Sequence, residues 1–161
     1  MTRKWLLLLT AILPFSAAAV ELRDPVVRGL PPGQKNTAAF FSVTNPSSQT
    51  VTLRAGTSDV AGRVEIHSNS QRNGMMAMRK EDSVAIAPGQ TLDFVPGGYH
   101  LMLINLKQPL RHGERVHFSL LIDGDVVQVE APVRSVLNEP ASGHHHHHGG
   151  ALPGRGPSGA S

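Results

Sequence analysis

The sequence contains no cysteine among its 161 residues. This absence excludes disulfides, cysteine-ligated zinc, iron–sulfur clusters, thiol nucleophiles and a cysteine-linked lipid anchor. It also excludes a blue-copper site, which needs a thiolate ligand. Aromatic residues make up only 4% of the chain, and the formal net charge is only +3. Because no basic patch is interleaved with aromatic residues, we expect no nucleic-acid partner.

Long hydrophobic runs are also missing, apart from one short segment at the N-terminus. That segment, residues 5–15, is too short to span a bilayer, which needs about 20 apolar residues. It follows a basic start, Arg3 and Lys4, and precedes three small residues that end at Ala19. This order is typical of a secretory signal peptide. We predict that residues 1–19 are such a peptide, cleaved near Ala19, and that the exported protein has no membrane span.

Residues 20–137 alternate between short apolar segments and turn residues. The segments are rich in Val, Ile, Leu, Phe and Thr, and many alternate with a period of two, which predicts strands. The predicted strands are 22–28, 37–45, 50–56, 63–68, 75–80, 83–87, 91–95, 99–106, 115–122 and 126–133. Asn73-Gly74 and Asp123-Gly124 predict tight hairpin turns, in which both turn residues need positive φ. Many short strands at close spacing predict an antiparallel sandwich or barrel.

The composition changes from about residue 138. Residues 138–161 hold six of the sixteen glycines and three of the twelve prolines, which predicts a disordered tail. Its run of five histidines is His144, His145, His146, His147 and His148. Clustered imidazoles on a flexible chain bind Cu(II), Ni(II) or Zn(II). The run is therefore either a secondary metal site that gathers Cu(II) or a purification tag.

The predicted strand 99–106 places two metal-binding residue types side by side. Alternate side chains of a strand share a face, so His100 and Met102 point one way. Leu101 and Leu103 point the other way, and theirs is the natural core face. An imidazole and a thioether therefore lie together on the opposite face.

A second histidine, His67, ends the predicted strand 63–68 and points away from the core face together with Glu65. A hairpin that joins this strand to the next one would bring His67 close to the methionines of that strand. Met76 and Met78 share one face there, because they are two residues apart.

Two imidazoles with neutral thioethers form a soft set of donors. Such a set favours Cu(I) over zinc, calcium or magnesium, since zinc prefers thiolate, imidazole or carboxylate. Each residue alone has an ordinary alternative, because methionine often fills a core and histidine often forms surface hydrogen bonds. We assign the other two histidines of the domain, His112 and His117, to that ordinary group.

The spacing of these residues resembles that of the periplasmic copper chaperones of the PCu(A)C family, which carry His-x10-Met-x21-His-x-Met. Here ten residues separate His67 from Met78, and 21 residues separate Met78 from His100, which is followed by Leu101 and Met102. The neighbouring segments LPPGQ, PGGYH and LKQPL are also similar to that family. The resemblance covers about residues 22–133.

The resemblance implies an all-β, cupredoxin-like Greek-key sandwich or barrel for residues 20–137. The Cu(I) ligands it implies are His67, Met78, His100 and Met102. It further implies a monomeric periplasmic metallochaperone, not an enzyme, that delivers copper to cytochrome c oxidase during assembly. The acceptor would be the copper-site subunit of that oxidase or another assembly factor.

Some alternatives stay open at this point. Met75 or Met76 could also contact the metal. A metal-free β-sandwich module for adhesion or assembly is the main alternative function, since this architecture serves many such functions. A copper enzyme is disfavoured, because a chain processed to begin at Val20 lacks an N-terminal histidine and shows no recognisable Ser/His/Asp arrangement.

Overall fold

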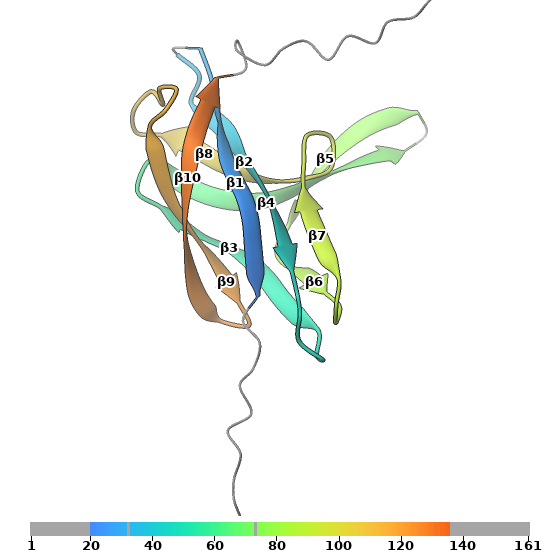
Figure 1. Cartoon of the computed structure of the whole chain (residues 1–161). Coiled ribbons are helices and arrows are strands. Elements are labelled where there is room, and N and C mark those ends of the chain that lie inside the picture. The colour runs from blue at the N-terminus through green and yellow to red at the C-terminus, as the bar shows by residue number, and fades with distance from the viewer. Residues whose placement is uncertain (1–19, 32, 73, 136–161) are drawn as a thin grey trace, which may run out of the picture.

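The computed structural model describes residues 20–31, 33–72 and 74–135. Within these ranges the chain forms strands and turns only (Figure 1), and it contains no helix that could cross a membrane. The strands are β1 (Glu21–Gly29), β2 (Asn36–Thr44), β3 (Val51–Ser58), β4 (Ala61–Arg72), β5 (Met75–Glu81), β6 (Val84–Ile86), β7 (Thr91–Phe94), β8 (Tyr99–Leu106), β9 (Arg115–Ile122) and β10 (Asp125–Ser135). The predicted signal peptide 1–19 and the histidine run 144–148 lie outside the described residues.

All ten predicted strands are present, and most begin and end within two residues of the predicted positions. The turn after β9 is confirmed, with φ of 51° at Asp123 and 96° at Gly124. One boundary was wrong, because β4 continues to Arg72 and not to residue 68. His67 therefore lies inside β4 and not at its end, since pairing with β5 extends the strand by four residues.

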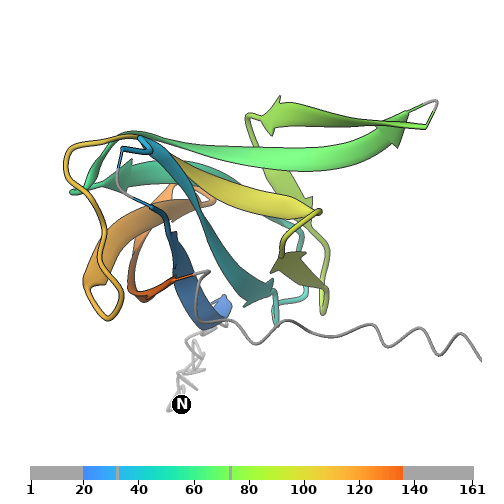
Figure 2. The ribbon, with the colours of Figure 1, turned by 90° about the horizontal axis from the view of Figure 1, so that it is seen from above.

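The strands form two layers that are joined along one side. Their order is β5-β4-β8-β7-β2-β1-β10-β9-β3-β6, and β1 pairs in parallel with β10. The first six strands in that order form one layer and the last four form the other (Figures 1 and 2). The consecutive strands β3 and β4 belong to different layers, so the chain crosses between them. This arrangement confirms the predicted all-β Greek-key sandwich.

A core of aromatic and aliphatic side chains fills the space between the layers. Phe41 stacks on Phe94 with ring centroids 4.4 Å apart, and Phe118 of the other layer lies 5.9 Å from Phe41. Leu101 and Leu103 of β8 are fully buried against this core. Each such side chain stabilises the fold by about 1.5–3 kcal/mol. Shifting β8 by one residue would expose both, so their burial determines which face of β8 is turned outward.

The far ends of β4 and β5 continue beyond the sandwich as a two-stranded arm (Figure 2). The two strands stay paired from Ile66 and Glu81 out to Arg72 and Met75. The near part of β4 is also paired with β8, from residue 61 to residue 68. Alternate side chains of β5 therefore extend the outer face of the sheet formed by β4 and β8.

Candidate metal centre

β4 lies between β5 and β8 and brings the two predicted histidine ligands together. His67 is directly opposite His100 in the pairing of β4 with β8. Directly paired residues of adjacent strands point to the same face of a sheet. The ring centroids are accordingly 5.8 Å apart, with an angle of 56° between the ring planes. His100 is only 6% exposed, so its ring is held firmly in place.

Met78 reaches His67 from the neighbouring strand β5. Its strand partner is Asn69, which lies two residues after His67 and on the same face of β4. The Met78 Sδ atom lies 3.1 Å from Nδ1 of His67. The Met78 side chain is nevertheless 59% exposed. The predicted hairpin thus brings a thioether into contact with an imidazole at the surface.

Met102 lies on the same face of β8 as His100, two residues farther along the strand. Its partner on β4 is Glu65, and its partner on β2 is Ala38. Residues two apart in a strand are about 6.6 Å apart, which is within reach of a methionine side chain. The structure therefore brings His67 into contact with His100 and Met78, and it places Met102 one alternate position away on the same face.

Two further methionines lie on the arm beyond Met78. Met76 has Gln71 as its strand partner and shares the face of Met78, because the two are separated by one residue. Met75 points to the opposite face. Both are strongly exposed, at 64% for Met76 and 71% for Met75. Met76 is therefore the only one of this pair that shares a face with His67.

Each histidine ring of the cluster has a hydrogen-bond partner that is not one of the predicted ligands. Nε2 of His67 lies 2.9 Å from Oε2 of Glu65, and Nδ1 of His100 lies 3.1 Å from the carbonyl oxygen of Gly98. Glu65 is also paired with Lys80, whose Nζ is 3.3 Å from Oε1. The hydrogen bond with His67, aided by Lys80, lowers the pKa of the Glu65 carboxyl and outweighs the opposite effect of its burial.

The sequence predicted that Glu65 shares the face of His67 but assigned it no role. The available signal was the Glu-x-His spacing within one strand, which places the two side chains side by side. Both side chains are largely buried, with exposed fractions of 17% for Glu65 and 15% for His67.

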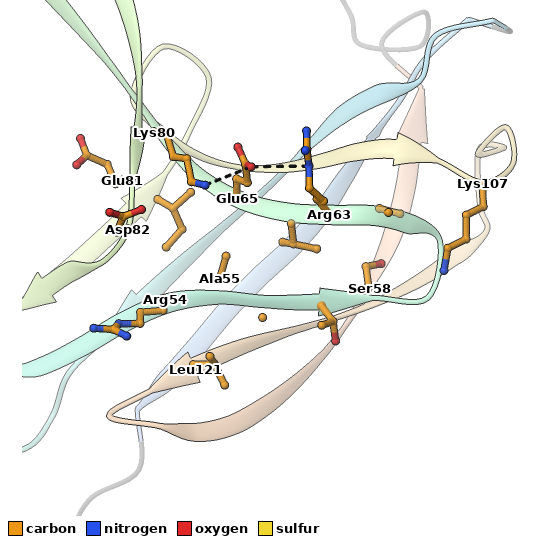
Figure 3. Close-up of a pocket in the computed structure, with 16 residues that line it drawn as sticks. Arg54, Ala55, Ser58, Arg63, Glu65, Lys80, Glu81, Asp82, Lys107 and Leu121 are labelled. Carbon is orange, nitrogen blue, oxygen red and sulfur yellow. Dashed lines mark hydrogen bonds and ion pairs between the residues drawn. The ribbon is translucent and has the colours of Figure 1, made fainter.

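A groove of about 740 Å³ lies between β3 and β4 (Figure 3). Its lining includes charged side chains of both signs, namely Arg54, Arg63, Glu65, Lys80, Glu81, Asp82 and Lys107. Figure 3 shows Arg63 and Lys80 directed at Glu65, at 3.9 and 3.3 Å from its Oε1 atom. The four predicted ligands are all among the described residues, and none of them lines this groove. Glu65 lines the groove and also contacts His67.

The remaining histidines of the domain have ordinary surface partners. Nδ1 of His112 accepts a hydrogen bond from the backbone N–H of Ser135 at 3.2 Å. Nε2 of His117 lies 3.1 Å from Glu130. In the part of the chain that the structure describes, no three His, Asp or Glu side chains gather so as to hold a metal ion. The candidate cluster of imidazoles and thioethers offers softer donors than a group of that kind would.

Solved structures share this fold. The copper-bound PCuAC domain from PmoF2 has a TM-score of 0.63 at 18% identity, over 75% of this chain and 97% of that one. The solution structure of CuI-DR1885 from Deinococcus radiodurans has a TM-score of 0.58 at 28% identity, over 74% of this chain and 81% of that one. These likenesses confirm a cupredoxin-like β fold of the PCuAC type.

A sequence relative and a family model complete the comparison. "Putative lipoprotein Lxx21020" from Leifsonia xyli subsp. xyli is 36% identical over 104 residues, which are 63% of this chain and 63% of that protein. The chain thus spans less than two thirds of the length of this curated relative. The family model described as "Putative lipoprotein LpqE-like" matches residues 20–133, which is nearly the whole sandwich. The chain therefore belongs to the LpqE-like family, with the fold of a PCuAC domain.

Proposed function

We propose that this protein is an exported copper carrier whose domain, residues 20–137, holds one Cu(I) ion on the outer face of β4, β5 and β8. The proposed ligands are His67, Met78, His100 and Met102. The observation that carries the proposal is the contact of 3.1 Å between the His67 Nδ1 atom and the Met78 Sδ atom, beside the His100 ring. Two donor atoms from different strands converge there on one point of the surface.

The spacing of these two atoms suits a shared metal ion. In tetrahedral zinc sites, bonds of about 2.0 Å to nitrogen and about 2.3 Å to sulfur separate the two donors by about 3.5 Å, and we take a similar spacing for Cu(I). The observed separation is 3.1 Å. A movement of the exposed Met78 side chain by a few tenths of an ångström is enough, and its surface position allows it.

The chemistry of the donors selects the ion. Thioether sulfur and imidazole nitrogen are soft or intermediate neutral donors, which favour Cu(I) over zinc, calcium or magnesium. The two solved relatives support this choice, since one is described as copper-bound and the other as a Cu(I) form. The site has no anionic ligand among the four, so a thiolate-bearing acceptor binds copper more tightly and can remove it.

The exposure of the site suits transfer to a partner. Met78 is 59% exposed, whereas His100 is 6% exposed. The Met78 thioether is therefore accessible to a docking partner, and incoming thiolates can replace the thioethers one at a time while the histidines still hold the ion. We propose that the acceptors are the copper centres of cytochrome c oxidase or an assembly factor for them.

The proposed compartment is the bacterial periplasm, where such an acceptor would be reached. Membership of a family described by its lipoproteins supports export. In this scheme the protein is a carrier and not an enzyme, because its site binds and releases an ion without changing a substrate.

An anaerobic titration with Cu(I) tests the proposal. The full chain and its Met102→Leu and His100→Ala variants would compete for Cu(I) with a coloured Cu(I) chelator of known affinity. We expect one tight Cu(I) per wild-type chain and a loss of at least about tenfold in affinity in each variant, the size of loss seen even for residues that only support a ligand. Equal, weak binding by all three proteins would contradict the carrier function.

A further inference from the structure

The hydrogen bonds of the two histidine rings determine which nitrogen of each ring is free. A neutral imidazole carries one N–H donor and one lone pair, and the second nitrogen is fixed by what the first one bonds. Only the nitrogen with the lone pair can bind a metal ion. The partner of one ring nitrogen therefore determines whether the other nitrogen is the one that can bind copper.

For His67 the deciding partner is Glu65. An ionised carboxylate can only accept hydrogen bonds, so the Nε2–H of His67 donates to Oε2 of Glu65 across 2.9 Å. The lone pair is then on Nδ1, which faces the Sδ atom of Met78 at 3.1 Å. A thioether sulfur has no hydrogen to donate, so two lone pairs face one another. A cation between them turns this unfavourable contact into a favourable one.

For His100 the deciding partner is a backbone carbonyl. The Gly98 oxygen can only accept, so the Nδ1–H of His100 donates to it across 3.1 Å. Nε2 of His100 therefore carries the lone pair. The two neighbouring rings thus offer opposite nitrogens, which follows from their different partners.

Glu65 is itself held in place from its other side. Its second oxygen, Oε1, accepts a hydrogen bond from the Lys80 ammonium at 3.3 Å and lies 3.9 Å from Nε of Arg63. Lys80 is also the direct strand partner of His67 on β5. The carboxylate is therefore clamped between a cation and the imidazole, and it cannot turn away from His67 without leaving Lys80.

We propose that Glu65 is a positioning residue of the copper site: it holds His67 as the Nε2–H tautomer, so that His67 binds copper through Nδ1, while the Gly98 carbonyl makes His100 bind through Nε2. This inference rests on the proposed function, because it states how the same site presents its donors. Outer partners of this kind typically change metal affinity by 10–100-fold when removed.

The tautomers can be measured without any metal. Long-range nitrogen–proton correlation spectra of the metal-free full chain, recorded at a pH where the rings are neutral, distinguish the two tautomers of each histidine. The signals of interest are identified by their loss in His67→Ala and His100→Ala proteins. We expect the Nε2–H form for His67 and the Nδ1–H form for His100. The Nδ1–H form at His67 in the wild-type protein would overturn the inference.

The role toward copper is tested with a matched pair of variants. Glu81 is 16% exposed, close to the 17% of Glu65, and it lies on β5, the strand next to the β4 strand of Glu65, but it bonds Ser68 and Arg79 and not an imidazole. We expect Glu65→Ala to lower Cu(I) affinity by about 10–100-fold and Glu81→Ala by less than about threefold. The histidine run 144–148 is the same in every variant, so its contribution to copper binding cancels when the variants are compared.

A third variant separates positioning from a general effect of charge. In Glu65→Gln the side-chain oxygen can still accept the Nε2–H of His67, so we expect most of the affinity and the Nε2–H tautomer to be retained. Thermal unfolding of each variant shows whether it is folded. Equal losses in Glu65→Ala and Glu81→Ala would overturn the positioning role.

The two proposals can fail separately. If the wild-type protein shows the expected tautomers but binds no Cu(I), the proposed function is wrong and the tautomer assignment stands. If the wild-type protein binds one Cu(I) tightly while Glu65→Ala binds it equally well, the carrier function stands and the role of Glu65 is wrong.

Discussion

Replacing Met78 by leucine removes one sulfur atom and leaves a side chain of similar size. Because Met78 is 59% exposed, the change removes little buried surface, and the free energy of unfolding should change by less than about 0.5 kcal/mol. The Sδ atom, however, lies 3.1 Å from Nδ1 of His67 and is one of two proposed sulfur ligands. Stability and copper affinity should therefore respond very differently.

We expect the dissociation constant for Cu(I) to rise at least about tenfold in Met78→Leu, which corresponds to about 1.4 kcal/mol. Met76→Leu is the matched control, since Met76 is on the same strand and the same face and is 64% exposed. It lies one alternate position farther out on the arm, so its replacement should change the constant by less than about twofold.

The assay is an anaerobic competition with a coloured Cu(I) chelator, run beside thermal unfolding of the same samples. The reasoning would be refuted if Met76→Leu weakened binding as much as Met78→Leu did. Unchanged binding in Met78→Leu would equally refute it, because the contact with His67 would then have no part in holding the ion.

Three further predictions concern stability. Leu101 is fully buried, so Leu101→Ala should lower the free energy of unfolding by about 2–5 kcal/mol, measured by urea denaturation; a loss below 1 kcal/mol would contradict the assigned core face of β8. Gly124 has a φ of 96°, so Gly124→Ala should destabilise the protein by more than about 0.5 kcal/mol, and no change would argue against the β9–β10 turn. The folded-state pKa of Glu65 is lowered from 4.5, so its ionised form stabilises the protein fully above about pH 4.5 and progressively less as the pH falls through the lowered value. The difference in unfolding free energy between wild type and Glu65→Gln should therefore shrink in acid, and a difference that grew below pH 4.5 would contradict the hydrogen bond to His67.

β8 shows how much a local pattern can predict. The alternation of His100, Leu101, Met102 and Leu103 predicted two faces, and the structure confirms that both leucines are fully buried. The prediction succeeds because strand geometry itself places successive side chains on opposite faces. The free energy gained by burying two leucines then determines which face of β8 is turned to the core.

β4 shows where the local pattern stops. Its last four residues, 69–72, are polar and carry no apolar alternation, so the sequence predicted that the strand ends at residue 68. The structure continues it because backbone hydrogen bonds with β5 extend the pair out to Met75. Such pairing depends on a partner strand, and the polar segment alone contains little sign of it.

The sequence did not predict the hydrogen bond between Glu65 and His67 or a role for it. Their shared face follows from the spacing of two, but their hydrogen bond, and the contact of Lys80 from the next strand with the second carboxylate oxygen, depend on side-chain positions that the spacing does not determine. The free nitrogen of His100 could not be predicted from the sequence either, because it depends on the position of the Gly98 carbonyl in the preceding turn.

The order of residues alone determined the fold class, the number of strands and the candidate donors, because alternation and turn chemistry act over a few neighbouring residues. The hairpin of β4 and β5, which the sequence also predicted, brings Met78 to His67. The tertiary structure decided that His67 stands opposite His100 and which nitrogen of each ring is free. The first relation joins strands far apart in the sequence, which only the packing of the shared core aligns, and the second depends on side-chain positions that the order of residues does not determine.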